Sequence, residues 1–308
     1  MRSASWLAYA LVPFMEVITR PFGLWSTVGV FGRLGGLVGP LVPQLRARID
    51  GNLDLIHPDW PMERRRRLIA DCTDHFSRLV VEYLHLRRFV WQVTLEVDGM
   101  HHLEAAAAEG RGVLIVTAHY GNWEAIRVAC LRAGLPSGII YRPFNNRYID
   151  DHTLGLIVDA GTPVMQKGPK GLRSLARHLS RGGRALLLAD QRTSHAPQIP
   201  FLGHPAETLT VAPALAQRTG ALLVTARARR LDRRGRFHVR IEAPLPDGAP
   251  EDQMREVNRR IGAWIAEDPS QWFWLHHRWK LSKKRGRRAA AGPRRRTAPA
   301  ARRDDPHA

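Results

Sequence analysis

The residue types best suited to proton transfer occur together in one short segment, Ala118-His-Tyr-Gly-Asn-Trp-Glu124. A histidine titrates near neutral pH and can take a proton from a hydroxyl, while a nearby carboxylate can hold its other ring nitrogen in one tautomer. We expect His119 on a strand-to-helix loop and Glu124 in the first helical turn, because their spacing does not put them on one helix face. Gly121 would permit the bend and Asn122 would cap the helix. The alternative is a loop histidine with only local hydrogen bonds.

Other common catalytic arrangements are missing from the sequence. It contains no G-x-S-x-G segment, no phosphate-binding P-loop and no G-x-G-x-x-G after a predicted strand. The paired histidines are adjacent rather than one helical turn apart, and neither cysteine has a second one at metal-ligand spacing. We therefore expect neither a metal nor a cofactor. A base without a protein nucleophile indicates direct transfer, in which a hydroxyl of the substrate attacks.

A strand and a helix must position the segment around His119. Residues 112–117 form a continuous apolar run typical of a fully buried strand, and a helical pattern over about 122–132 follows. Apolar runs and helical patterns continue to alternate, which favours an α/β fold with a mostly parallel central sheet flanked by helices. In such sheets ligands bind at the carboxyl ends of the strands, where His119 would lie.

The other predicted elements follow the same alternation. A helix is expected from Asp59, its candidate cap, to about Phe89. Asp232–Gly235 predicts a hairpin turn and hence one antiparallel edge. The remaining predicted strands are 93–97, 137–141, 162–165, 185–189, 221–226 and 237–241, and the remaining predicted helices are 148–158, 172–179 and 209–218.

The composition excludes several classes of protein. The 308 residues are 44% hydrophobic, so most of the chain can bury a core and is not disordered. Two cysteines are too few for a disulfide framework, which favours a reducing compartment. The net charge is +19, of which residues 283–308 carry +8, so that segment is predicted to be a disordered basic tail. The remaining +11 favours an acidic partner or an anionic surface.

The first 45 residues are predicted to form a membrane anchor. Trp6–Ile18 and Phe22–Leu45 are apolar, although glycines, prolines and Arg33 interrupt the second stretch. One span, or a re-entrant or surface-lying anchor, fits this pattern, and the alternative is a buried helical hairpin of a soluble protein. Basic residues follow the anchor, so the positive-inside rule places the body in the cytoplasm. The predicted division is an anchor over 1–45, a catalytic domain over 46–282 and the tail over 283–308.

The segment AHYGNWEA closely resembles the H-x4-E active-site motif of the lipid A late acyltransferases, within the wider H-x4-D/E glycerolipid acyltransferase-like group. These bacterial enzymes add secondary acyl chains to a lipid A precursor. Ala118 stands where many members have asparagine. His277 stands where the closing block of the family, residues 269–280 here, usually has arginine, which leaves the role of that block open. Further blocks resemble the family in the same order: 48–59, 82–83, 141–145, 189–192, 200–208 and 269–280.

The resemblance implies a membrane-associated O-acyltransferase on the cytoplasmic face of the bacterial inner membrane. His119 would deprotonate the free hydroxyl of a 3-hydroxyacyl chain on the glucosamine disaccharide, and that oxygen would attack the thioester of an acyl carrier protein. Glu124 would orient His119 and stabilise its charge. No cofactor is implied.

Six further positions, one of them the aromatic residue Phe201, are candidates for substrate binding. Arg142 and Arg192 follow strands on the same side of the sheet, where they could hold substrate phosphates or the developing oxyanion. The alternative to substrate binding is that each of these arginines only forms an exposed salt bridge. Asp190 and Gln191 match a family block and are expected to act in positioning. Asn122 belongs to the motif itself.

The sequence allows two locations for each of four aromatic residues. Phe201 could line an acyl groove or pack in the core. Trp272, Trp274 and Trp279 could lie at the lipid headgroup level or in the core beside a terminal helix.

The expected partners are an acidic acyl carrier protein, a lipid A precursor and an anionic membrane surface, all of which suit the +11 body. A lysophospholipid or another glycolipid could present the same hydroxyl, and the motif does not separate these acceptors. A nucleic-acid-binding protein would explain the charge but neither the anchor nor His119, so no specific nucleic acid is expected. A non-catalytic membrane scaffold is the third alternative.

Overall fold

The computed structural model describes residues 16–144 and 146–279, and the basic tail lies outside this part. It confirms the predicted α/β class. A seven-stranded sheet has the order β1-β9-β8-β2-β5-β3-β4, in which the five strands from β8 to β4 are mutually parallel. The strands are β1 (Thr94–Asp98), β2 (Val113–Thr117), β3 (Ser137–Tyr141), β4 (Val164–Gln166), β5 (Arg184–Leu188), β8 (Leu222–Arg230) and β9 (Arg236–Ile241).

The predicted hairpin is present, because β8 and β9 pair antiparallel across Asp232–Gly235. It does not end the sheet, since β1 pairs parallel with β9 outside it. A separate two-stranded hairpin, β6 (Gln198–Phe201) with β7 (His204–Glu207), was not predicted. Its strands are only four residues long, so the alternation is too brief to recognise.

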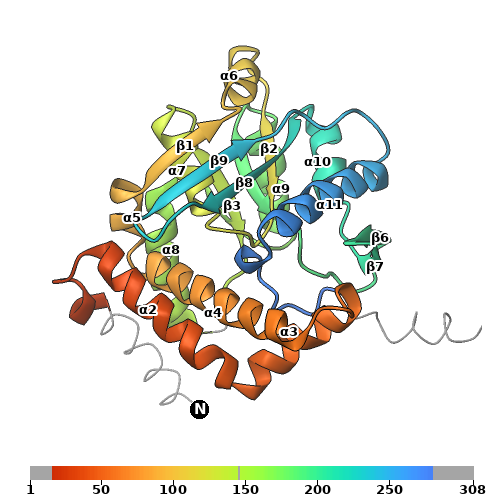
Figure 1. Cartoon of the computed structure of the whole chain (residues 1–308). Coiled ribbons are helices and arrows are strands. Elements are labelled where there is room, and N and C mark those ends of the chain that lie inside the picture. Colours follow the sequence, from red (N-terminus) through yellow and green to blue (C-terminus); the bar gives the residue numbers. More distant parts are fainter. Residues whose placement is uncertain (1–15, 145, 280–308) are drawn as a thin grey trace, which may run out of the picture.

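Helices cover both faces of the sheet and the carboxyl ends of its strands (Figure 1). The predicted helix over 59–89 is divided at His85, and Pro61 rather than Asp59 precedes it. The helices are α2 (Leu24–Val38), α3 (Pro43–Ile56), α4 (Met62–Leu84), α5 (Leu86–Gln92), α6 (His101–Ala108), α7 (Glu124–Arg132), α8 (Arg147–Ile157), α9 (Pro169–Leu179), α10 (Val211–Thr219) and α11 (Pro250–Glu267).

Alternate residues of β2 enter two different cores, which explains why the whole strand is apolar. Leu114 and Val116 pack with residues of α9, α10 and α11 on one face. Val113 and Ile115 pack with residues of α5, α6 and α7 on the other. Helix α4 contributes to both cores. Its His75 ring contacts the carbonyl oxygen of Gly121, so α4 crosses the carboxyl end of β2.

The N-terminal segment does not contain one helix long and apolar enough to cross a membrane, within the residues described. Helices α2 and α3 meet the length and composition criterion only together, and they are bent by 79° at the break. Figure 1 shows both at the bottom of the view, beside α4. Most of the predicted apolar stretch Trp6–Ile18 lies outside the described residues.

Candidate active site

His119 lies on the loop between β2 and α7, as the sequence predicts. Gly121 in this loop has a φ of +57°, and a Cβ there would overlap the carbonyl oxygen of Ala228. Its N–H donates to the carbonyl of Gln271 at 2.9 Å. The Asn122 N–H donates to the Ala228 carbonyl at 3.3 Å. The loop is therefore held from both sides, and glycine is required because a side chain would fill the space of the neighbouring strand.

Asp190 is the carboxylate that binds His119. Its Oδ1 lies 2.7 Å from the ring Nδ1, and its Oδ2 accepts the backbone N–H of His119 at 3.0 Å. Strands β2 and β5 pair in parallel with Thr117 opposite Leu188. His119 and Asp190 each follow the paired residue of their own strand by two positions. The sheet register therefore brings the two side chains together.

Asp190 is buried, yet its surroundings favour the charged form. Burial by itself would raise the pKa of this carboxyl group, but the charge of His119 and hydrogen bonds from His119 and Trp272 lower the pKa below its ordinary value. The Trp272 indole N–H donates to Oδ2 at 2.9 Å. An ionised carboxylate can only accept hydrogen bonds, so the proton of the neutral His119 ring lies on Nδ1.

The second ring nitrogen of His119, Nε2, then carries no proton and can act as a base. Its Nε2 lies 3.3 Å from the side-chain nitrogen of Gln191, an amide N–H that can donate to the Nε2 lone pair. The His119 side chain is 23% exposed and lines a cavity of about 580 Å³. An oriented imidazole with an accessible lone pair can accept a proton from a hydroxyl in that cavity.

Glu124 does not bind His119, contrary to the sequence-based prediction. It is fully buried at the first position of α7, where Oε1 accepts the Tyr83 hydroxyl at 2.6 Å. Its Oε2 pairs with the Arg127 guanidinium at 2.6 Å. A buried carboxylate needs a partner, and Arg127, one turn later on the same helix, is available locally. Arg127 also donates to the carbonyls of Ser137, Ile157 and Gly161.

The cavity beside His119 is mostly apolar, with a few cations. Arg142 is exposed and makes no hydrogen bond or ion pair within the described chain, and Lys167 also lines the cavity. Arg192 is held by Glu207, whose Oε2 accepts its Nε–H at 2.8 Å. The apolar lining comes from Ile139, Ile140, Ile157, Leu172, Leu187, Leu188, Leu209 and Val211. Such a lining suits a hydrocarbon chain that carries a charged or polar end.

Three of the six predicted substrate-binding residues line the cavity, and the other three, Asp190 among them, are buried. Arg142, Gln191 and Arg192 line the cavity. Asn122 does not, because it is buried between Glu82, which accepts its amide at 2.9 Å, and the Glu124 N–H. Phe201 is also buried, and Arg278 lies over its ring. The structure therefore agrees with the alternative in which Phe201 packs in the core.

The closing block is a buried support for the site. Trp272, Trp274 and Trp279 are at most 9% exposed, so they belong to the core and do not reach headgroups. The His276 Nε2 accepts the backbone N–H of Arg192 at 2.8 Å. Burial lowers the pKa of His276 to about 4, which keeps the ring neutral and able to accept.

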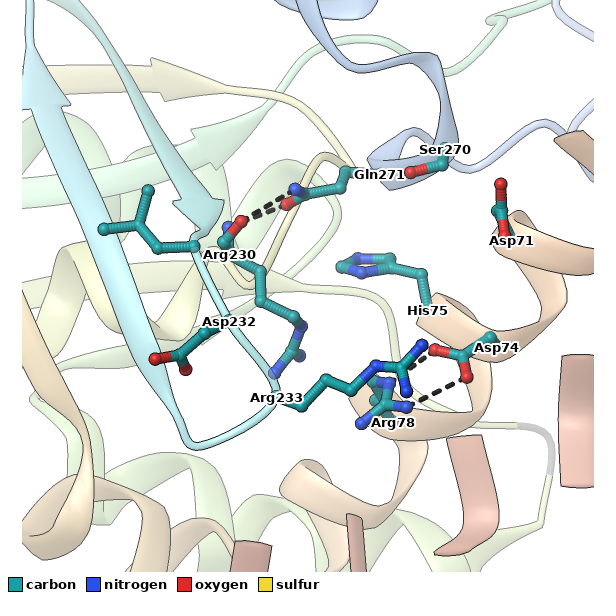
Figure 2. Close-up of a pocket in the computed structure, with 10 residues that line it drawn as sticks. Asp71, Asp74, His75, Arg78, Arg230, Asp232, Arg233, Ser270 and Gln271 are labelled. Atoms are coloured by element: carbon teal, nitrogen blue, oxygen red, sulfur yellow. Dashed lines mark hydrogen bonds and ion pairs between the residues drawn. The ribbon is translucent and has the colours of Figure 1, made fainter. Parts of the chain in front are cut away.

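A second, polar cavity of about 240 Å³ is lined by residues that contact the His119 loop, among them His75 and Gln271 (Figure 2). His75 lines it and binds the Gly121 carbonyl at 3.2 Å. Arg230 also lines it and pairs with the buried Glu82, which in turn holds Asn122. Figure 2 shows Gln271 bonded to the Arg230 backbone. This network connects α4, β8 and the closing block to the loop that carries His119.

The sequence prediction missed three features of the site. Tyr83, Trp123 and Lys167 line the cavity but were not singled out. Tyr83 fell in a family-like block and Trp123 in the motif itself, whereas Lys167 lay in none of the blocks. Within the described part of the chain, no group of three or more His, Cys, Asp or Glu side chains is arranged to hold a metal ion.

Comparisons with known proteins bear on this site. A sequence family described as bacterial lipid A biosynthesis acyltransferase matches residues 3–281. A lipid A biosynthesis lauroyltransferase of Escherichia coli is 27% identical over 83% of this chain and 89% of its own. A lipid A biosynthesis acyltransferase of Haemophilus influenzae is 21% identical over 79% and 78%. A phosphatidylinositol mannoside acyltransferase of Mycobacterium tuberculosis is 27% identical over 66% of each chain.

Proposed function

Because the chain belongs to the bacterial lipid A biosynthesis acyltransferase family, we propose that it moves a fatty acyl chain from an acyl carrier protein to a hydroxyl of a lipid A precursor. The family assignment makes the chain an acyltransferase of lipid A biosynthesis. The donor, the acceptor hydroxyl and the residue roles are our proposals. The observation that carries them is the Nδ1–Asp190 hydrogen bond of His119 at the wall of an apolar cavity.

In the proposed reaction His119 Nε2 takes the proton of the acceptor hydroxyl. The oxygen attacks the thioester carbonyl carbon, a C–O bond forms, and the C–S bond then breaks. The imidazolium returns its proton to the leaving thiolate. Asp190 holds the neutral ring in its Nδ1–H tautomer and stabilises the imidazolium that forms when Nε2 takes the proton. Glu124 acts at a distance, because it fixes Tyr83 and Arg127 beneath the site.

The cations of the cavity suit the rest of the acceptor. Arg142 has no partner in the described chain and lies at the cavity surface, so it is available for a phosphate or for the oxyanion of the tetrahedral intermediate. Lys167 adds a second charge. Arg192 is already paired with Glu207, so we assign it to positioning of the loop that carries Gln191.

We propose that α2 and the facing part of α4 lie against the membrane. Leu34, Leu37 and Leu41 are 50–77% exposed on the α2 side, and Phe76 and Val80 of α4 are 36% and 43% exposed. Of these, Leu34, Phe76 and Val80 line an apolar groove of about 510 Å³ between the two helices. A surface-lying anchor explains exposed leucines that a soluble hairpin would bury. Flotation with anionic vesicles, compared with the variant Leu34→Glu/Leu37→Glu, tests this.

A different glycolipid is the alternative acceptor. The similarity to a phosphatidylinositol mannoside acyltransferase supports it, because that relative is named for an acceptor outside lipid A. The base and the cavity would serve either acceptor.

The deciding experiment is acyl transfer from labelled acyl carrier proteins to a tetra-acylated lipid A precursor and, in parallel, to lysophospholipids and phosphoinositide mannosides. Transfer to the lipid A precursor that His119→Ala abolishes is the expected result. Transfer only to one of the other acceptors would show that the acceptor is not a lipid A precursor, while the proposed mechanism would stand. Equal transfer by wild type and His119→Ala would exclude His119 as the base.

A further inference from the structure

Helix α9 begins at the cavity and carries a row of cations away from it. Pro169, its first residue, lines the cavity beside Lys167 and Gly168. Leu175 and Leu179 are buried on one face of the helix. Lys170, Arg173 and Arg177 are exposed, at the spacing of one helical face, and Arg181 is exposed just beyond the helix end. We call these four residues the α9 basic row.

The α9 basic row has no neutralising partners. None of its four side chains forms a hydrogen bond or an ion pair with any residue in 16–144 or 146–279. The sequence explains this, because no Asp or Glu occurs between Asp159 and Asp190. Exposed arginines on α11 behave differently, since Arg255 and Arg259 pair with acids of their own helix. The helix that starts at the active-site cavity thus carries exposed cations without acidic partners on its own helix, unlike Arg255 and Arg259 of α11.

We propose that the α9 basic row is the docking surface for the acidic carrier protein that delivers the acyl thioester. This inference rests on the proposed function. A carrier protein presents its acyl chain on a flexible phosphopantetheine arm, and the arm must enter the cavity beside the carrier's own contact surface. A row of unpaired cations that begins at the cavity attracts an acidic helix and aligns it with that entrance.

The position of α9 separates this surface from the proposed membrane face. Figure 1 shows α9 beside the sheet, while α2 and α3 lie at the bottom of the view. A lipid acceptor that approaches from the α2 side and a protein donor that approaches over α9 can thus reach the same histidine. The row also ends beside the amino end of β5, away from the carboxyl ends where His119 lies.

The test combines charge reversal with two donors. The variant Arg173→Glu/Arg177→Glu should raise the KM for acyl carrier protein thioester about 10- to 100-fold, within the range of electrostatic steering, with little change in kcat. The Kd for apo carrier protein, measured by titration without acceptor, should rise in parallel. Turnover of a short acyl-pantetheine thioester, which lacks the carrier protein, should change less than twofold.

The control is Arg234→Glu/Arg240→Glu, which makes the same charge change at exposed residues of the β8–β9 hairpin. It should leave the KM and Kd for the carrier protein near wild type. An unchanged Kd for the carrier protein in the α9 variant would overturn the docking proposal. If that variant also lost binding to vesicles while its carrier affinity stayed intact, the α9 basic row would be assigned to lipid binding instead. Absence of transfer from every thioester by the wild type would instead refute the proposed function.

Discussion

The ring Nδ1 of His119 lies 2.7 Å from Oδ1 of Asp190, although 71 residues separate them in the chain. Their two strands are neighbours in the sheet, and each residue follows its strand by the same distance. The pair therefore depends on a central, buried part of the fold.

Asp190→Asn should lower kcat about 10²- to 10⁴-fold with little change in the KM for the acceptor, because asparagine neither stabilises the imidazolium nor holds the Nδ1–H tautomer. Steady-state kinetics measure the change, and ¹⁵N spectra of the His119 ring should show the loss of the single tautomer. The control Asp159→Asn makes the same chemical change at a surface pair with Arg87. A normal kcat in Asp190→Asn would exclude this pair from the mechanism.

Trp272→Phe should shift the acid limb of the pH–kcat profile to higher pH. The substitution keeps the ring packed but removes an N–H donated to the ionised Asp190, so the pKa of Asp190 rises. A hydrogen bond to a charged group contributes about 1.5–3 kcal/mol. The matched control is Trp274→Phe, whose indole donates to the carbonyl of Pro269 instead. An identical shift in both variants would mean that packing, and not the Asp190 contact, is responsible.

Glu124→Ala should reduce the free energy of unfolding by about 3–5 kcal/mol, because it leaves the buried Arg127 without its counter-charge. Urea denaturation of Glu124→Ala measures this loss, and urea denaturation of Arg127→Met and of the double variant then measures the coupling between the two residues. We expect the double variant to lose less than the sum of the singles, since it removes both charges. For Glu124→Gln, a kcat loss as large as that of Asp190→Asn in a fully stable protein would instead place Glu124 in the chemistry.

Stability should fall as the pH drops below about 6.5, partly through His75. Burial, with the charge of Arg230, lowers the pKa of this ring to about 3 in the folded state, while the unfolded ring has a pKa of 6.5. Between these values the unfolded chain binds more protons, so acid favours unfolding. His75→Gln should flatten the dependence of unfolding free energy on pH between 6.5 and 4.5, whereas exposed His101→Gln should leave its slope unchanged. Equal slopes in all three proteins would contradict a buried neutral His75.

The local sequence determined much of this protein. The apolar runs predicted β2, β3, β5 and β9 to within about one residue of their ends, while β8 continues past the predicted end at residue 226 to Arg230. Strand β2 gave the clearest signal because a strand buried on both faces is apolar throughout. The segment after β2 identified His119 and its place at a carboxyl end. Weak local signals were missed, as in the short β6–β7 hairpin.

The tertiary structure decided which carboxylate meets His119. The motif pointed to Glu124, but the partner of a side chain depends on which strands are neighbours and in what register, and periodicity within one segment carries no information on either. Asp190 reaches His119 because β5 lies beside β2. Glu124 turns to Arg127 because a buried carboxylate takes the nearest buried cation. The place of His119 after β2 was therefore readable from the sequence, while the carboxylate that contacts it was set by the packing of the sheet.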